Sequence, residues 1–190
     1  MTIQDRKQRE NEARRRAILS ASRLIAETEG WNALTTRRLA HEIEYSQPVI
    51  YAHFDGRDAI IEAIALEGFD ELATVLNSAH LTTADPRQAL LALASAYSDF
   101  ADRSPALYEA MFVARSTLSF ANAATPDVMK AAFQEIVSAV RPFAAGRPPG
   151  VLAEVVWAAL HGVCTLKRGS RLGPEPQSQR LEIIVGLVAG

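Results

Sequence analysis

The stretch TTRRLAHEIEYSQPVIYAHF, from Thr35 to Phe54, holds two short groups of apolar residues separated by Glu44, Tyr45 and Ser46. Within each group the apolar residues recur at intervals of three and four, which predicts one short amphipathic helix per group. Thr35 is a suitable N-cap for the first helix and Ser46 for the second, with Pro48 in the first turn, where its missing N–H costs little.

Two short helices joined by about three residues are typical of a helix-turn-helix, whose second helix enters the major groove of DNA. An ordinary helical corner in a bundle has the same spacing. Spacing alone therefore leaves both interpretations open.

The length of 190 residues suits one or two domains with a substantial core, and 48% of the residues are hydrophobic. The longest apolar stretches, such as residues 151–163, are interrupted by Glu154 or end within a few turns, so we expect no membrane span. The polar, basic N-terminal segment does not resemble a secretory signal, and the lone Cys164 cannot form an internal disulfide. We therefore expect a soluble protein of the cytoplasm.

Charge is unevenly distributed, although the formal net charge is only −2. Residues 1–23 carry seven Lys or Arg against three acids, whereas residues 58–190 carry ten against fourteen. The small net charge argues against a protein that coats nucleic acid over its whole surface. The basic start is a mild indication of a polyanion contact, with a solvated, frayed helix start as the alternative.

Helical periodicity continues on both sides of the opening stretch. An apolar stripe that starts at Ala17 predicts a helix ending at Gly30, and the Asp55-Gly56 turn precedes a longer helix that fades near Asn77. Further helices are predicted after Asp85-Pro86, Ser104-Pro105 and Thr125-Pro126, from Val151 to about Arg168, and at the C-terminus. About nine helices and no alternating strand pattern indicate an all-α protein.

The segment RRRAILSASRLIAETEGWNALTTRRLAHEIEYSQPVIYAHFDGRDAIIEAI resembles the DNA-binding domain of the TetR family of transcriptional repressors. Its most specific part is SQPVIYAHF followed by Arg57, where Tyr51, His53 and Phe54 fall on the family's characteristic tyrosine, histidine and aromatic positions. The position at the turn that is usually Gly is Glu44 here. A left-handed conformation at a residue other than Gly costs about 1–2 kcal/mol, so we expect a strained or altered turn.

The C-terminal part resembles the WHG-like branch of the same family through AYSDFADRSPALYEAMF and WAALHGV. The resemblance implies a helix-turn-helix DNA-binding domain over residues 1–57. It implies a helical effector-binding and dimerisation domain over residues 58–190.

For the recognition helix, the resemblance implies that Gln47, Pro48 and Val49 face bases, Gln47 through its amide and the other two against a thymine methyl. Arg37 matches a position that reaches guanine, with a phosphate contact as the alternative. The predicted DNA-binding set also contains Thr36, Ser46, Tyr51, His53 and Arg57. Most of these would donate to phosphates, but a packing role for the tyrosine and a solvated Arg57 are the alternatives.

A homodimer on a palindromic operator is expected, because one such unit makes too few contacts for operator-level specificity. We expect the dimer face on the last two helices, with monomer core as the alternative assignment of the same residues. The expected apolar stripe is Ala153, Val156, Trp157, Leu160 and Val163 with Leu181, Ile184 and Val188.

The resemblance also implies an effector pocket in the C-terminal helices. The candidate lining residues are Tyr97, Phe100, Tyr108, Met111, Phe112, Phe133, Trp157 and His161. Helical core is the alternative for each of them. Such a pocket would be mainly apolar and would suit a small lipophilic or aromatic compound.

Two other classes of function compete with a DNA-binding regulator. The four histidines are scattered, and no HExxH, ExxH pair, GxSxG or phosphate-binding glycine loop occurs, so the sequence indicates neither an enzyme nor a cofactor or metal site. A helical scaffold would share the bundle but should tolerate loss of Arg37, Gln47 and Tyr51.

Overall fold

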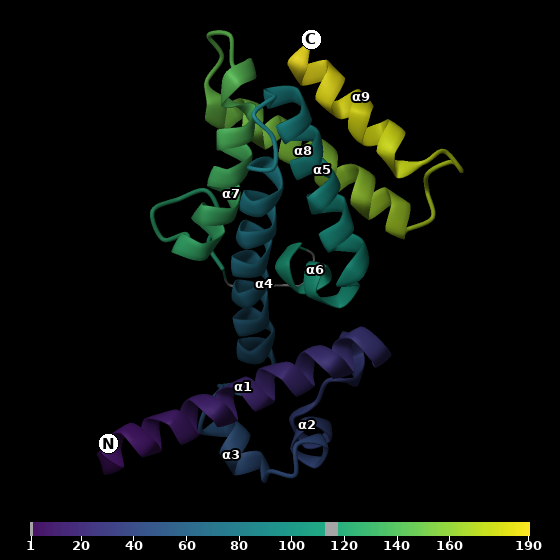
Figure 1. Ribbon diagram of the computed structural model, residues 1–190. Coiled ribbons are helices and arrows are strands. Elements are labelled where there is room, and N and C mark those ends of the chain that lie inside the picture. Colours follow the sequence, from purple (N-terminus) through teal and green to yellow (C-terminus); the bar gives the residue numbers. More distant parts are fainter. Residues whose placement is uncertain (1, 113–117) are drawn as a thin grey trace. The chain divides into compact units, whose positions relative to one another are not determined.

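The computed structural model describes residues 2–112 and 118–190, and these form nine α-helices and two short 3-10 helices (Figure 1). The first α-helices are α1 (Ile3–Glu29), α2 (Thr36–Glu42), α3 (Gln47–Tyr51), α4 (Gly56–His80) and α5 (Pro86–Arg103). The others are α6 (Pro105–Phe112), α7 (Asp127–Val140), α8 (Pro149–Arg168) and α9 (Gln177–Ala189), with η1 (Trp31–Ala33) and η2 (Arg141–Phe143). The all-α fold class predicted from the sequence is confirmed.

Two compact units share these helices. The first contains α1, α2, α3 and the start of α4 as far as Gly68, and it also includes α6. The second contains α4 from Phe69 onwards together with α5, α7, α8 and α9. The boundary predicted between residues 57 and 58 falls in the first turn of α4, whereas packing keeps α4 in the first unit for several turns more.

The first unit has a continuous apolar core. Ile18 of α1, Leu39 of α2 and Ile50 of α3 are each 0% exposed, so these three helices bury their apolar stripes against one another. Burial of this kind stabilises each side chain by about 1.5–3 kcal/mol relative to an exposed position. The core fixes the angle at which α3 is presented.

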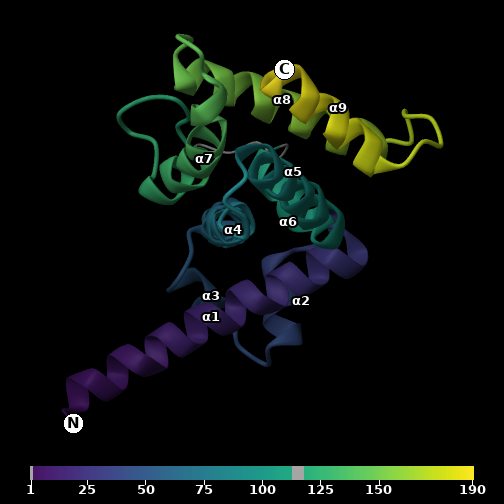
Figure 2. The same cartoon turned by 45° about the horizontal axis from the view of Figure 1, so that its top comes forward.

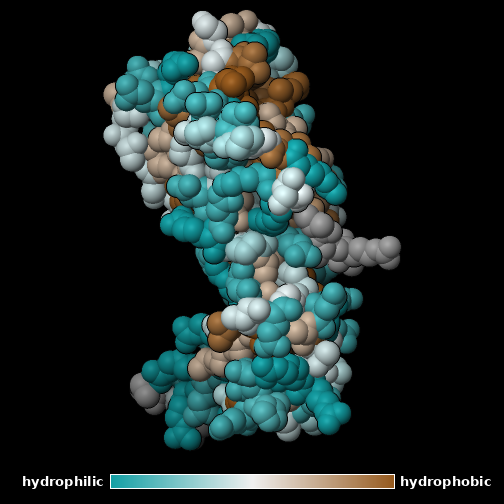
Figure 3. All heavy atoms as spheres, turned by 90° about the vertical axis from the view of Figure 1, so that its right-hand side faces the viewer, coloured by the Kyte–Doolittle hydropathy of each residue, from teal (hydrophilic) through white to brown (hydrophobic). Residues whose placement is uncertain are grey.

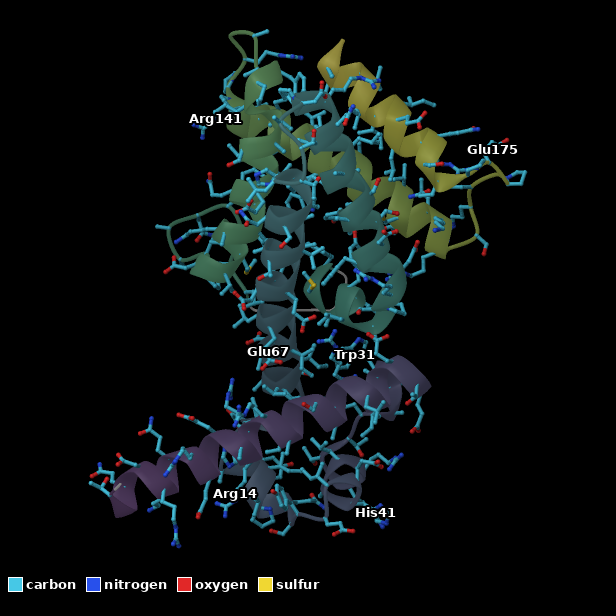
Figure 4. The ribbon with its side chains drawn as sticks, viewed as in Figure 1. Arg14, Trp31, His41, Glu67, Arg141 and Glu175 are labelled. Carbon is cyan, nitrogen blue, oxygen red and sulfur yellow. The ribbon has the colours of Figure 1, made fainter. Side chains whose placement is uncertain are left out.

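Helix α6 docks onto α1 through polar contacts as well as packing. The Trp31 indole N–H donates to the Ala106 carbonyl over 2.9 Å (Figure 4). The Glu27 carboxylate accepts from the backbone N–H groups of Ala106 and Leu107, each over 3.1 Å. These are N–H groups that the start of a helix leaves without an intrahelical partner, so Glu27 caps α6 from a distant part of the sequence.

The predicted helix starts are largely confirmed, but only some of the predicted capping residues act as caps. Thr35 accepts from the Arg38 backbone N–H over 3.0 Å, and Asp85 accepts from Gln88 over 2.7 Å. Ser46 occupies the N-cap position of α3 without a side-chain capping bond. At α7 the N-cap is Pro126 rather than the preceding threonine, because the hydroxyl of Thr125 accepts from Asn122 instead.

In the second unit α5 packs against α7, α8 and α9, and α8 and α9 lie side by side (Figure 2). Leu90 and Leu93 of α5 and Leu160 of α8 are each 0% exposed and form the centre of this core. Lys167 near the end of α8 pairs with Asp102 of α5 over 2.6 Å.

By length and composition alone, α8 could cross a membrane, which the sequence interpretation based on Glu154 did not anticipate. In the structure 28% of the 18-residue apolar stretch of α8 is buried. The helix is apolar on two sides, since Leu152, Val156 and Leu160 face the core while Val151 and Val155 are exposed. Helix α9, whose Ile183 and Leu187 are exposed, likewise keeps an apolar side outside the core.

Candidate nucleic-acid interface

The turn between α2 and α3 depends on the backbone of Glu44, whose φ is 54°. The following N–H, of Tyr45, donates back to the Ala40 carbonyl over 3.0 Å and closes the last turn of α2. This arrangement is that of a Schellman cap, which usually has Gly at the left-handed position. The left-handed geometry expected at this residue is therefore present.

Leu39 and Ile50 point into the core, so the opposite sides of α2 and α3 face outward. Five of the predicted DNA-binding residues are exposed: Arg37, Ser46, Gln47, Pro48 and Tyr51. The other four are partly buried: Thr36, Val49, His53 and Arg57. The start of α3 thus presents the Gln47 amide and the Pro48 ring outward, with Val49 half-buried beside them, a combination suited to base edges and thymine methyls.

The structure brings two of the predicted phosphate contacts together. The Thr36 hydroxyl at the start of α2 and the Tyr51 hydroxyl at the end of α3 are 3.4 Å apart. Tyr51 is 55% exposed, so about half of the side chain lies on the surface. Only the remaining part can serve the packing role that was the alternative. Two hydroxyls at this separation can donate to a single phosphate group.

Several cations near this face are used inside the protein instead. Arg38 pairs with Glu29 over 3.0 Å and with Glu42 on its own helix, and these two carboxylates, the first above all, raise the pKa of Arg38. The Arg57 guanidinium donates to the Trp31 carbonyl over 2.8 Å. Arg57 is therefore not a freely solvated side chain, and it has a partner within the protein.

The guanidinium of Arg15 stacks on the Phe54 ring, 4.5 Å from the ring centre, and connects α1 to the residues that follow α3. From the sequence, Arg38 had no predicted role, and Arg15 was only one of the cations of the basic N-terminal segment. The spacing of four residues between Arg38 and Glu42 could have predicted their ion pair from the sequence. The contacts of Arg38 with Glu29 and of Arg15 with Phe54 depend on the fold.

The predicted effector-lining residues fall into both units. Tyr108, Met111 and Phe112 belong to α6 in the first unit, whereas Tyr97, Phe100, Phe133, Trp157 and His161 belong to the second. Met111 packs so tightly against α4 that a Cβ at Gly68 would lie 2.7 Å from its sulfur. Tyr108 and Met111 are buried in the core of the first unit and Phe112 is half-buried, and the role of these three as lining residues stays a prediction.

In the second unit, aromatic side chains gather around Trp157. Its indole N–H donates to the Tyr97 hydroxyl over 3.1 Å, and its ring meets Phe133 edge to face with centroids 6.2 Å apart. One turn further along α8 lies His161, whose pKa is lowered by burial and secondarily by the nearby Arg168. The cluster combines apolar surface with a few polar groups.

Over residues 2–112 and 118–190, no group of three or more His, Cys, Asp or Glu side chains is placed to hold a metal ion. Burial is also the main cause of a raised pKa at the Cys164 thiol. A raised pKa disfavours the thiolate, which is the reactive and metal-binding form of cysteine.

The apolar stripe expected to form a dimer face lies mostly in the monomer core. Ala153, Val156, Leu160, Leu181 and Ile184 are all buried. The outward side of the same two helices is also apolar, with Val151, Val155 and Leu166 on α8 and Ile183 and Leu187 on α9 exposed by 41–80%. Figure 3 shows hydrophobic side chains gathered on the upper part of the face that it views, where the C-terminal helices lie.

On α8 the outward stripe recurs at intervals of three and four residues, through the exposed Val151, Val155, Ala158 and Leu166 and the half-buried Gly162. A Cβ at Gly162 would meet no atom within 4 Å, so the surface is open there. We call this stripe, together with Ile183 and Leu187, the outer face of α8 and α9.

Two protein-family models match the chain. A model described as bacterial regulatory proteins of the tetR family matches residues 18–64. A model described as the Tetracyclin repressor-like C-terminal domain matches residues 90–185, about half of the chain.

Individual proteins and a solved structure are also similar to this chain. An uncharacterised HTH-type transcriptional regulator of Mycobacterium tuberculosis is 25% identical over 154 residues, which cover 80% of this chain and 69% of that protein. The class C tetracycline repressor protein of Escherichia coli is 32% identical over 75 residues, 40% of this chain and 32% of that repressor. A solved structure of a protein with unknown function from Rhodococcus sp. RHA1 is 27% identical, with a TM-score of 0.77 and 92% of each chain covered.

Proposed function

Because the chain belongs to the TetR family of transcriptional regulators, we propose that it acts as a homodimeric repressor, which binds a palindromic operator and releases it when a small, mainly apolar effector binds. The observation that carries the proposal is the exposed row of hydrogen-bonding side chains on α2 and α3, backed by a closed apolar core. A surface of this kind offers donors both to phosphates and to base edges.

The roles on DNA divide by position. Gln47 at the first position of α3 reads adenine through its amide, and Pro48 and Val49 contact a thymine methyl. Arg37 donates to guanine, and the paired hydroxyls of Thr36 and Tyr51 donate to one phosphate. Ser46 and His53 flank this set and take part in the same backbone contacts.

The outer face of α8 and α9 supports the homodimer. Leu187 is 80% exposed and Ile183 is 63% exposed, and large apolar side chains at such exposure are unfavourable in a protein that remains monomeric. A second copy of the same face would form a four-helix interface, in which the open surface at Gly162 allows the helices to approach closely. The two recognition helices would then meet half-sites about 34–36 Å apart.

The cluster around Trp157, Tyr97 and Phe133 supports an effector of lipophilic or aromatic character. Its surroundings are apolar, and the Tyr97 hydroxyl and His161 ring are the polar groups that could orient a ligand. Release of DNA requires that the effector bind the two conformations of the dimer with different affinity, by about 1–3 kcal/mol for a 5- to 150-fold effect.

Selection of DNA fragments tests the proposal directly. Purified protein is incubated with random duplexes and with genomic fragments, and the retained DNA is sequenced. We expect a palindrome with half-sites one helical turn apart, and subsequent release of that duplex provides a screen for effectors. Retention that depends on salt but not on sequence, or no retention at all, would favour a helical scaffold instead.

A further inference from the structure

The N-terminal half of α1 lies outside the core of the first unit. Residues 4–16 are all exposed, whereas Ile18 and Leu19 two residues later are 0% and 3% exposed. In Figures 1 and 2 this part of the helix runs on beyond α2 and α3. We call residues 4–16 the arm; at 1.5 Å per residue it is about 20 Å long.

The core-facing stripe of α1 changes character where the arm begins. Ile18, Ser22 and Ile25 form the buried part of the stripe, and the same three- and four-residue spacing continues toward the N-terminus. In that direction the positions are Arg14, Asn11, Lys7 and Gln4. The side of α1 that faces α2 and α3 therefore carries only cations and amides in the arm.

Local interactions keep the arm helical without packing. Thr2 and Asp5 form a capping box, in which the Asp5 N–H donates to the Thr2 hydroxyl over 3.2 Å and the Thr2 N–H to the Asp5 carboxylate over 2.8 Å. Arg6 pairs with Glu10 over 3.2 Å, four residues along the same helix. An exposed helical segment of this length is marginal by itself, so these contacts and its continuity with the packed half maintain it.

The cations of the stripe are available to an outside partner. Within the part of the chain that the structure describes, neither Lys7 nor Arg14 takes part in an ion pair, and the three acids of the arm lie at other positions around the helix. Figure 4 places Arg14 below α1, on the side where α3 lies. The arm thus extends the polar surface of α2 and α3 with positive charge.

We propose that the arm binds the phosphate backbone of DNA flanking the sequence that α3 reads, with Lys7 and Arg14 as the main contacts and Asn11 between them. The inference rests on the proposed DNA-binding function. Seven residues of α-helix separate the two cations by about 10 Å, so they reach two different phosphates of one backbone. Contacts of this kind position the protein and add affinity without reading sequence.

The test compares two double variants of the full chain that remove the same charge from opposite sides of the arm. Lys7→Gln with Arg14→Gln removes the proposed contacts. Arg9→Gln with Arg16→Gln is the control, because these two side chains lie on the far side of α1. Affinity is measured at several salt concentrations, on the selected operator trimmed to its palindrome and on the same operator extended by about ten base pairs at each end.

On the extended duplex we expect the Lys7/Arg14 variant to lose about tenfold or more in affinity, with a salt slope reduced by about 0.9 for each lost phosphate contact. The control variant should lose much less, and on the trimmed duplex the two variants should differ little. Ethylation interference with the parent protein should mark phosphates outside the palindrome. Circular dichroism confirms that both variants remain helical.

Equal losses of affinity in the two variants, or the same loss on both duplexes, would show that the arm does not bind the flanking DNA. An absence of flanking ethylation signals would show the same. The proposed binding of an operator would still stand. If the parent protein shows no preference for any operator, the proposed function itself fails, and this outcome is visible before any variant is made.

Discussion

The surface of α2 and α3 and the outer face of α8 and α9 are both exposed and both helical, but they are composed of opposite kinds of side chain. At the first, the exposed ring of Tyr51 ends in a hydroxyl and Gln47 ends in an amide. At the second, Ile183 and Leu187 offer only hydrocarbon. A polar surface is satisfied by water when it has no partner, whereas an apolar one loses about 25 cal/mol for each Å² left exposed. The proposed function therefore assigns a reversible partner, DNA, to α2 and α3 and a permanent one, a second copy of the chain, to α8 and α9.

Charge on the outer face should have the largest effect. Ile183→Glu combined with Leu187→Glu would place like charges against each other in a two-fold interface, so we expect a monomer at micromolar concentration. Operator affinity should fall by two orders of magnitude or more, because a monomer contacts one half-site. Analytical ultracentrifugation and DNA titration measure the two effects.

The matched control is Leu81→Glu, because Leu81 is 67% exposed and follows the end of α4. It should leave both the mass and the affinity unchanged. A double variant of the outer face that sediments like the parent protein would show that this face is not the interface, and the exposed leucine and isoleucine would then need another partner.

Removal of one amide from the first surface should have a smaller and more selective effect. Gln47→Ala should cost about 1–3 kcal/mol on the selected operator, the usual value of a bidentate base contact, and little on random DNA. Gln134→Ala, an exposed glutamine of α7, is the control and should change neither. Equal losses on operator and random duplexes would exclude Gln47 as a base reader.

The helices could be predicted from the sequence because their signals are local. Pro86, Pro105 and Gly30 mark helix ends within one turn of the observed ones. The left-handed backbone at Glu44 was expected instead from the family resemblance, which places Gly at that position. The polar face of α3 follows from periodicity, since Ile50 is fully buried and Gln47 is exposed.

Features that depend on distant parts of the chain could not be predicted in this way. α8 is apolar on two sides, so periodicity cannot tell that Val156 is buried and Val155 exposed. The place of α6 in the first unit depends on Glu27, which caps residues 79 and 80 positions away. The bond from Arg57 to the Trp31 carbonyl likewise exists only after folding.

This bond leads to a prediction of intermediate size for Arg57, for which the sequence left a phosphate contact and a solvated side chain as alternatives. Arg57→Ala should lower the free energy of unfolding by about 1 kcal/mol, the usual net value of a hydrogen bond, and weaken binding to all DNA sequences. Arg57→Lys keeps the charge but loses the guanidinium geometry, so it should restore the salt slope without restoring stability. Thermal unfolding and salt titrations separate the two contributions. A melting temperature unchanged in both variants would show that the bond to Trp31 contributes nothing measurable.

The smallest effect is expected at Glu44, the residue of the α2–α3 turn that combines backbone strain with a negative charge. Glu44→Gly should stabilise the fold by about 0.5–1 kcal/mol, because Gly relieves the cost of a positive φ but loses more conformational entropy on folding. Ser170→Gly, at a φ of 52° and outside α2 and α3, should give a similar gain in stability with no change in DNA binding.

Glu44→Gln separates the two properties of the residue, since it removes the carboxylate and keeps the side chain at a φ of 54°. If the charge limits affinity, Gln and Gly should both tighten DNA binding, and more so at low salt. If the strained backbone sets the angle of α3, only Gly should change the affinity, and its effect should not depend on salt. An unchanged affinity in both variants would mean that neither the charge nor the backbone strain of Glu44 affects DNA binding. The packing of Ile50 in the core would then be what holds α3 in place.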